Sequence, residues 1–246
     1  MWIPRRFNLA VVLLAWLCAP AGAATLTVLS PASAAPGLQA LAAPFTAKTG
    51  IAVTLAGGAR SRVLDTLKAG GPADVVVMPT NDLVEMPTVA GMTPLGRIAV
   101  GVAVKAGAKV PDISTPEKFR AALLAAKGVA YADPAAGTSA GKMIEQMLSA
   151  PEFKTVKRVP VQGLAATALS SGQAEIALQL LPELAADKTV ALAGPVPEAY
   201  GAGADFSAGI AMVSMDAVAA QAFISFITDR QNAALWKQNG VSVLGY

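Results

Sequence analysis

The sequence has no histidine among its 246 residues and a single cysteine, Cys18. Without an imidazole, Ser-His-Asp and Cys-His catalysis, histidine metal sites and imidazole acid–base chemistry are all excluded. The aspartates are well separated along the chain and form no cluster with metal-ligand spacing. Few classes of enzyme remain, and we expect a protein without a cofactor or resident metal.

The N-terminus has the pattern of a secretory signal. Arg5 and Arg6 precede an apolar stretch, 9–18, that is too short to span a bilayer. Small residues follow at 20–24, so we predict a cleaved signal peptide over 1–24, with an N-terminal membrane anchor as the alternative. Cleavage would also remove Cys18 and leave a chain without disulfide or thiol chemistry.

The charge balance is close to neutral once this segment is set aside. The full chain carries a formal charge of +3, and without Arg5 and Arg6 it has 17 basic and 16 acidic residues, a net charge of +1. Nucleic-acid and membrane-surface binding need a dense positive patch. We therefore expect no nucleic-acid partner, and the charge balance gives no argument for binding to a membrane surface.

Short β-branched runs alternate with amphipathic segments, which predicts an α/β fold with mainly parallel strands. The predicted strands are 25–29, 51–55, 74–78, 98–104, 129–131, 175–180 and 206–214. The predicted helices are 37–48, a segment through 63–67, 114–127, 140–148, 164–170, 216–228 and 232–238. The stretch 194–203, rich in proline and glycine, is expected at the surface beside a crossing between lobes.

Three loops between a strand and a helix are rich in small and hydroxyl residues: 30–33, 57–62 and 133–142. In parallel α/β sheets, ligands gather where strands end and helices begin, because free N–H groups and the helix dipole favour anions there. The candidate side chains in these loops are Ser33, Arg60, Ser61, Thr138 and Ser139. Together the loops indicate an anion site.

Two enzyme motifs are only partly matched in the third loop and its surroundings. A phosphate-binding P-loop ending at Lys142 would need glycine at 136 and a hydroxyl at 143, where the chain has Ala136 and Met143. Ser139 and Lys142 fit the S-x-x-K of penicillin-binding enzymes, but the K-T-G at 48–50 precedes them instead of following. Neither nucleotide binding nor Ser–Lys hydrolysis is therefore favoured.

At these loops, and in the A-G-x-P-A-D element within 67–75, the sequence resembles the periplasmic molybdate-binding proteins of ABC importers. The resemblance extends over 172–180 and the two terminal helices, and so over nearly the whole mature chain. It implies a type II periplasmic binding protein with an anion cleft between two α/β lobes. It implies crossing strands near 99–104 and 206–213. One expected lobe combines 25–101 with 208–246, and the other is 102–207.

The resemblance also assigns positions to the ligand. It places a hydroxyl ligand at Ser33, the family's second serine at Arg60 beside Ser61, and the family's tyrosine at Gln179. Backbone donors fall near Ser139–Ala140 and Leu164–Ala165. With Thr138 from the third loop, the candidate ligand-binding residues are Ser33, Arg60, Ser61, Thr138, Ser139, Leu164 and Gln179.

Two of these positions depart from the molybdate binders, and this affects the expected ligand. A guanidinium at Arg60 suits the planar fork of a carboxylate, whereas desolvated tetrahedral oxyanions are commonly held by neutral donors. A small organic acid is therefore a rival to molybdate. Alternatively, Arg60 is an exposed first-turn residue and Gln179 a hydrogen-bonded residue at a strand end.

We therefore predict a monomeric periplasmic protein that binds a small anion and delivers it to the membrane permease of an ABC importer. A secreted enzyme on a similar fold is the alternative. It would need a base, and the candidates near the loops are Asp133, Glu145 and Glu175.

Overall fold

The computed structural model describes residues 24–136 and 138–243, and the predicted signal peptide with Cys18 lies outside this part. The strands are β1 (Thr25–Pro31), β2 (Ala52–Gly58), β3 (Val75–Pro79), β4 (Val89–Lys105), β5 (Val129–Ala132), β6 (Arg158–Val161), β7 (Ile176–Leu180), β8 (Val190–Pro195), β9 (Gly203–Ala211) and β10 (Val241–Val243). The helices are α1 (Ala35–Thr49), α2 (Arg60–Lys68), α3 (Thr80–Val84), α4 (Pro116–Ala125), α5 (Ser139–Leu148), α6 (Ala166–Ser170), α7 (Leu181–Ala186), α8 (Ala217–Ile227) and α9 (Ala233–Gln238).

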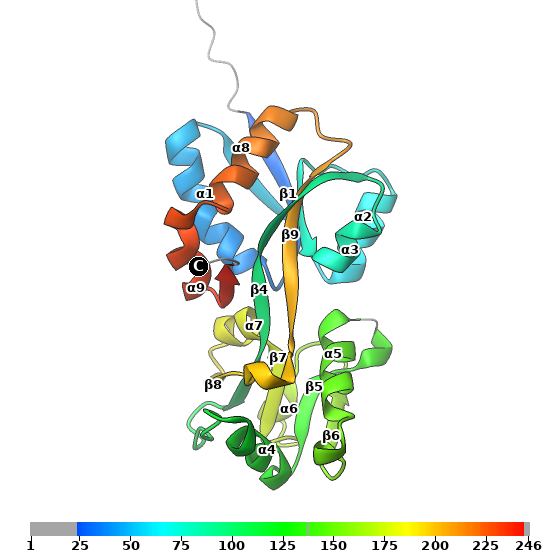
Figure 1. Ribbon diagram of the computed structural model, residues 1–246, viewed down its shortest axis with the longest axis vertical. Helices are drawn as coiled ribbons and strands as arrows, with labels where there is room; N and C mark the ends of the chain where they lie inside the picture. The colour runs from blue at the N-terminus through cyan, green and yellow to red at the C-terminus, as the bar shows by residue number, and fades with distance from the viewer. Residues whose placement is uncertain (1–23, 137, 244–246) are drawn as a thin grey trace, which may run out of the picture.

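Two sheets organise these elements into two lobes (Figure 1). Lobe 1 contains the strand order β2-β1-β3-β9-β4, with β10 on β4, and the helices α1, α2, α3, α8 and α9. Lobe 2 contains the order β4-β7-β5-β6, with β8 on β4, and the helices α4 to α7. The expected two-lobed α/β architecture is thus the one observed.

Each sheet is mixed. The outer strands are parallel, β2-β1-β3 in lobe 1 and β6-β5-β7 in lobe 2, as expected from the alternation of strands and helices. The strands β4, β8, β9 and β10 add antiparallel pairs. The sheets are therefore less parallel than the sequence predicted, because β4 and β9 run between the lobes in opposite directions.

β4 and β9 lie side by side as the connection between the lobes (Figure 1). β4 pairs with β9 through Ala99, and from Val100 onward it pairs with β7 and β8 of lobe 2. Phe206–Ile210 of β9 already pair with β3 of lobe 1. The second crossing therefore lies nearer Gly203 than the sequence placed it, whereas the lobe boundaries 25–101, 102–207 and 208–246 stay a prediction.

Local signals account for several helix ends. Thr115 caps α4 by accepting the N–H of Lys118 at 3.3 Å, and Pro116 occupies the first turn. Gly50 ends α1 in the left-handed conformation with φ 76°. Among the described helices, the longest is α1 with 15 residues, and none has both the length and the apolar character of a membrane span.

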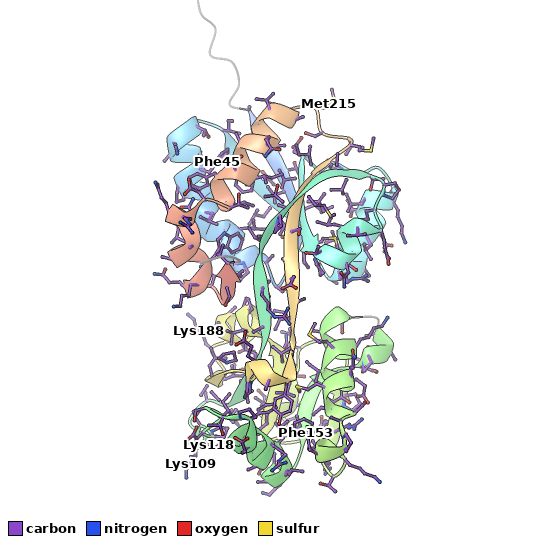
Figure 2. The ribbon with its side chains drawn as sticks, in the orientation of Figure 1. Phe45, Lys109, Lys118, Phe153, Lys188 and Met215 are labelled. Atoms are coloured by element: carbon purple, nitrogen blue, oxygen red, sulfur yellow. The ribbon has the colours of Figure 1, made fainter. Side chains whose placement is uncertain are left out.

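The terminal helices pack onto the first helix. Phe45 of α1 contacts Phe223 of α8 edge-on, with 5.0 Å between ring centroids. Trp236 of α9 is fully buried, and its indole N–H donates to the carbonyl oxygen of Ile227 at 2.7 Å. Figure 2 shows Phe45 within lobe 1 and Phe153 within lobe 2, so each lobe has aromatic side chains in its interior.

The structure contains elements that the sequence did not predict. β4 begins at Val89, nine residues before the predicted strand, and the irregular register around Pro94 accommodates residues that usually interrupt a strand. The short elements α3, α7, β6, β8 and β10 were likewise not predicted. β8 and the stretch after it overlap the Gly194–Gly203 segment, which the sequence had placed at the surface beside a crossing.

Candidate functional site

A pocket of about 240 Å³ lies between the lobes, where the loops after β1, β2, β5 and β6 converge. Lobe 1 contributes the turn before α1 and the start of α2, and lobe 2 contributes the start of α5, the residues just before α6 and the junction of β7 with α7. Five of the seven predicted ligand-binding residues line this pocket: Ser33, Arg60, Thr138, Leu164 and Gln179. Most of the other lining side chains are apolar, among them Met143, Leu180 and Phe206.

Ser33 lies in the turn between β1 and α1 and is 3% exposed. Within the described part of the chain, neither its hydroxyl nor its backbone N–H has a hydrogen-bond partner. No fully buried side-chain oxygen or nitrogen there is unpaired, so the hydroxyl of this largely buried residue keeps some exposure, at the pocket that Ser33 lines. An unpaired hydroxyl and an unpaired N–H beside a pocket are suited to a ligand that accepts hydrogen bonds.

The loop after β2 approaches β1 closely. At Gly57, with φ 129°, a Cβ would lie 2.0 Å from the carbonyl oxygen of Ser30. Only glycine adopts this backbone conformation without strain and leaves that space free. This contact brings the start of α2, with Arg60, next to the β1–α1 turn that carries Ser33.

Arg60 forms a two-point ion pair with Asp82 of α3. Its Nε donates to Asp82 Oδ2 at 2.7 Å, and its Nη2 donates to Oδ1. This hydrogen bonding raises the pKa of Arg60 above its ordinary value. A guanidinium has five N–H donors, so three remain for a ligand. Ser61, the next residue, is exposed and does not line the pocket.

The start of α5 is organised by Thr138. Its hydroxyl oxygen accepts the N–H of Gly141 at 3.1 Å, which caps the helix and leaves the hydroxyl proton available. Ser139 is the first residue of α5, and its side chain lies outside the description. Leu164 lines the pocket just before α6 and is 51% exposed, so its contribution is apolar surface and backbone.

Gln179 ends β7 and is 4% exposed. Its Oε1 accepts the N–H of Ala165 at 2.8 Å, and its Nε2 donates to Glu183 Oε2 at 2.6 Å. Both ends of the amide are therefore engaged within the protein. Gln179 positions the start of α6 and Glu183, in agreement with the alternative of a hydrogen-bonded residue at a strand end.

Asp82 and Glu183 are the acidic residues that sequence reasoning missed. Asp82 holds Arg60 in place across 22 residues of sequence. Glu183 lines the pocket, burial raises its pKa above the ordinary value of 4.5, and the hydrogen bond from Gln179 opposes that shift in part. The four-residue spacing of Gln179 and Glu183 did not predict their contact, because a strand ends and a helix begins between them.

None of the three bases considered for an enzyme lines the pocket. Glu145 binds Tyr131 and Arg158, and Glu175 binds Lys127 at the surface. Asp133 accepts the N–H of Ala135 at 2.9 Å and the amide of Gln162 at 2.7 Å. In the described residues, no group of three or more acidic, cysteine or histidine side chains is placed to hold a metal.

The A-G-x-P-A-D element has a structural role. Asp74 accepts the N–H of Thr27 at 2.8 Å and the hydroxyl of Ser214 at 2.7 Å. Its own N–H donates to the carbonyl oxygen of Thr27 at 2.8 Å. The carboxylate thus ties β3 to β1 and to the end of β9, away from the pocket lining.

A second, larger cavity of about 900 Å³ lies beside the crossing strands. It is lined by Arg97, Asp205 and the Gly194–Glu198 stretch, among others, and by none of the predicted site residues. Its arginine already donates to Asp205 at 2.9 Å and to the carbonyl oxygen of Gly201 at 2.8 Å. The smaller pocket between the lobes is therefore the candidate site.

Comparisons with known proteins identify the family and the fold. Residues 26–242 match the family described as bacterial extracellular solute-binding protein. A protein of Pseudomonas sp. named aconitate isomerase is 27% identical over 229 residues, covering 88% of this chain and 87% of its own.

Solved structures with the same fold include two that are named for molybdenum or molybdate. The substrate-binding domain of a putative molybdenum ABC transporter from Clostridium difficile has a TM-score of 0.71 at 15% identity, covering 89% of this chain and 99% of its own. The periplasmic molybdate-binding protein of Azotobacter vinelandii has a TM-score of 0.62 at 19% identity, covering 88% and 98%. At these identities the likeness establishes the fold and leaves the ligand open.

Proposed function

Because this chain belongs to the bacterial extracellular solute-binding protein family, we propose that it binds a small organic carboxylate between its lobes and delivers it to an ABC importer. The observation that carries the proposal is Ser33, which lines the pocket and whose hydroxyl and N–H have no hydrogen-bond partner among the described residues. Arg60 and the first turns of α2 and α5 add further donors around the same pocket.

The size and lining of the pocket favour a carboxylate over a tetrahedral oxyanion. Its volume of about 240 Å³ corresponds to roughly eight waters at about 30 Å³ each, more than the four oxygens of molybdate need. Alanine, leucine, methionine and phenylalanine side chains would contact a carbon skeleton, for which a tetrahedral oxyanion has no equivalent. The sequence relative named aconitate isomerase points to a carboxylate ligand as well.

The remaining features of the proposal follow from the family and the sequence. We place the mature protein, beginning after a signal peptide at 1–24, in the periplasm as a monomer without a cofactor or nucleic-acid partner. The lobes, 25–101 with 208–246 and 102–207, close by hinge motion around β4 and β9, and the closed form is the one that the permease recognises. The ligand is held by Ser33, Arg60, Thr138 and the N–H groups near Ser139 and Leu164.

Thermal unfolding of the mature protein with a panel of anions tests the proposal. The panel contains citrate, cis- and trans-aconitate, small mono- and dicarboxylates, molybdate, tungstate, sulfate and phosphate. An anion at a hundred times its dissociation constant adds about 2.7 kcal/mol, which shifts the midpoint by several degrees in a chain of this size. A shift with carboxylates supports the proposal. A shift with molybdate and tungstate alone refutes the carboxylate assignment, and no shift at all refutes the anion site.

Isomerisation of an unsaturated carboxylic acid is a second candidate function. The relative named aconitate isomerase covers 88% of this chain, and Glu183 supplies a carboxyl group at the pocket that is able to move a proton. Incubation of the mature protein with cis-aconitate, followed by proton NMR, distinguishes the two functions. Conversion that is absent from a Glu183→Gln sample indicates an enzyme, whereas binding without conversion indicates a transport protein.

A further inference from the structure

Glu183 places an unpaired carboxyl oxygen at a pocket proposed to take an anion. Gln179 uses its Oε1 on the N–H of Ala165, which directs its Nε2 to Glu183 Oε2 at 2.6 Å. Among the described residues, the other oxygen of Glu183 has no hydrogen-bond partner, and no cation is paired with this carboxyl group. A bare carboxylate at this position would repel the anion that the other groups attract.

The charges around the pocket lead to the same difficulty. Arg60 and Glu183 are the two ionisable side chains that line it, and Arg60 is already compensated by Asp82. An ionised Glu183 would therefore leave a net charge of −1 beside the bound anion. A neutral Glu183 removes this charge and turns its free oxygen into a hydroxyl donor.

The elements packed against α7 pair no cation with Glu183 among the described residues. α7 packs mainly on β4, β7 and β8, and neither β7 nor β8 carries an ionisable side chain. The turn at Gly240 also lies against Pro182 of α7, and Lys237, which precedes that turn at the end of α9, is exposed and forms no ion pair with Glu183. β4 carries Arg97, which is bonded to Asp205, and Lys105 at its lobe 2 end. On the chain after α7, Asp187 is bound to Thr189 and Lys188 lies at the surface (Figure 2).

Burial already favours the neutral form of this carboxyl group. It raises the pKa of Glu183 above 4.5, and the hydrogen bond from Gln179 reduces that shift without cancelling it. An anion bound nearby raises the pKa further, because two like charges at short range disfavour each other. The anion-bound protein therefore holds its proton to a higher pH than the free protein does.

We propose that the pocket takes up its anion together with one proton, which Glu183 carries as a neutral carboxyl group that donates to an oxygen of the anion. The proton comes from solvent or buffer, and no other bond is made or broken. This inference rests on the proposed anion-binding function and adds that binding is coupled to the uptake of a proton. Since the bound state holds more protons than the free state, affinity falls as the pH rises through the range between the two pKa values.

Isothermal titration calorimetry of the full mature chain tests the inference, with cis-aconitate and molybdate as probes. Each titration is repeated in two buffers of different ionisation enthalpy from pH 5 to pH 8. We expect uptake to approach one proton per bound anion between the pKa of Glu183 in the free protein, which burial raises, and its higher pKa in the bound protein, with affinity falling there by up to about tenfold per pH unit. Binding without proton uptake over this range overturns the inference and leaves the proposed function intact. Failure of both probes and of every other anion of the thermal-unfolding panel to bind overturns the inference and the proposed function together.

Two variants identify the group that takes up the proton. Glu183→Gln keeps a donor in place, so we expect it to bind the anion without taking up a proton. Its affinity should change with pH only as far as the probe itself titrates. Glu117→Gln is the matched control, because Glu117 also follows a proline in the first turn of a helix but is exposed. Proton uptake that persists in Glu183→Gln overturns the assignment, and the buffer comparison on the unaltered chain decides the matter if that variant does not fold.

Discussion

Ser33→Ala should separate binding from stability. Ser33 is 3% exposed at the pocket, and its hydroxyl has no partner among the described residues. In most buried positions, a serine-to-alanine change breaks a hydrogen bond within the protein and lowers stability. Here the change removes a donor that the folded chain itself does not use.

The expected magnitudes follow from this geometry. A hydrogen bond to a charged group contributes about 1.5–3 kcal/mol, so its loss weakens anion binding by roughly 10- to 150-fold. The free protein loses no hydrogen bond, because the hydroxyl has no partner among the described residues and is not fully buried. Its free energy of unfolding should therefore change by less than about 1 kcal/mol.

Two measurements on each protein are needed. Urea unfolding without ligand gives the free energy of unfolding, and calorimetric titration with the strongest carboxylate of the panel gives the dissociation constant. Ser61→Ala is the matched control, because Ser61 is exposed and lies outside the pocket lining. We expect it to change neither quantity.

The result that would refute this reasoning is equally definite. If Ser33→Ala binds the carboxylate within twofold of the unaltered chain, the hydroxyl is not a ligand. If it instead loses 2 kcal/mol or more of stability, Ser33 has a structural partner, and the pocket assignment must be revised. A loss of affinity in Ser61→Ala equal to that in Ser33→Ala would place the site on the exposed side of the second loop.

Three further predictions concern the framework around the site. Asp74→Ala removes two hydrogen bonds to a carboxylate and should lower the free energy of unfolding by about 2–4 kcal/mol without changing the affinity of the folded protein; urea unfolding and titration check both. Gly37→Ala places a Cβ 2.2 Å from a ring atom of buried Trp236. The overpacking cost of about 1–3 kcal/mol should exceed the helix-propensity gain of up to about 1 kcal/mol, so we expect a lower unfolding temperature. A raised unfolding temperature would contradict this. Arg158→Ala removes a partner of Glu145, at 2.6 Å, and because this pair is partly exposed we expect a loss of about 1 kcal/mol, seen as faster hydrogen exchange in α5.

The candidate site illustrates how far local patterns reach. The three loops were predicted from glycine, serine and threonine residues at strand ends, and three of their five candidate side chains line one pocket: Ser33, Arg60 and Thr138. The other two predicted residues in the lining, Leu164 and Gln179, came from the family resemblance. The guanidinium of Arg60, however, uses two of its five N–H donors on Asp82. The sequence argument that Arg60 binds a carboxylate ligand therefore holds for the three remaining donors. An ion pair between two short helices cannot be inferred from residues that lie 22 positions apart.

The missed strand and the missed acid have related causes. Pro94 and its neighbouring glycines disfavour a strand by local propensity, yet β4 continues through them because β9 pairs alongside and the register shifts to accommodate them. Glu183 looks like an ordinary first-turn acid of a short helix, similar to Glu117. Only the closeness of Gln179 and of the opposite lobe makes it part of a pocket.

The sequence by itself determined the α/β class, most strands and helices, the caps at Thr115 and Gly50, and the three loops, because all of these depend on periodicity and on interactions within a few residues. The tertiary structure alone decided which loops share a pocket, that Asp74 is a tie between strands, and that Glu183 lines the pocket without an ion-pair partner among the described residues. These properties depend on contacts between segments far apart in the chain. Desolvation and charge pairing are set by such contacts, and they decide what a side chain does.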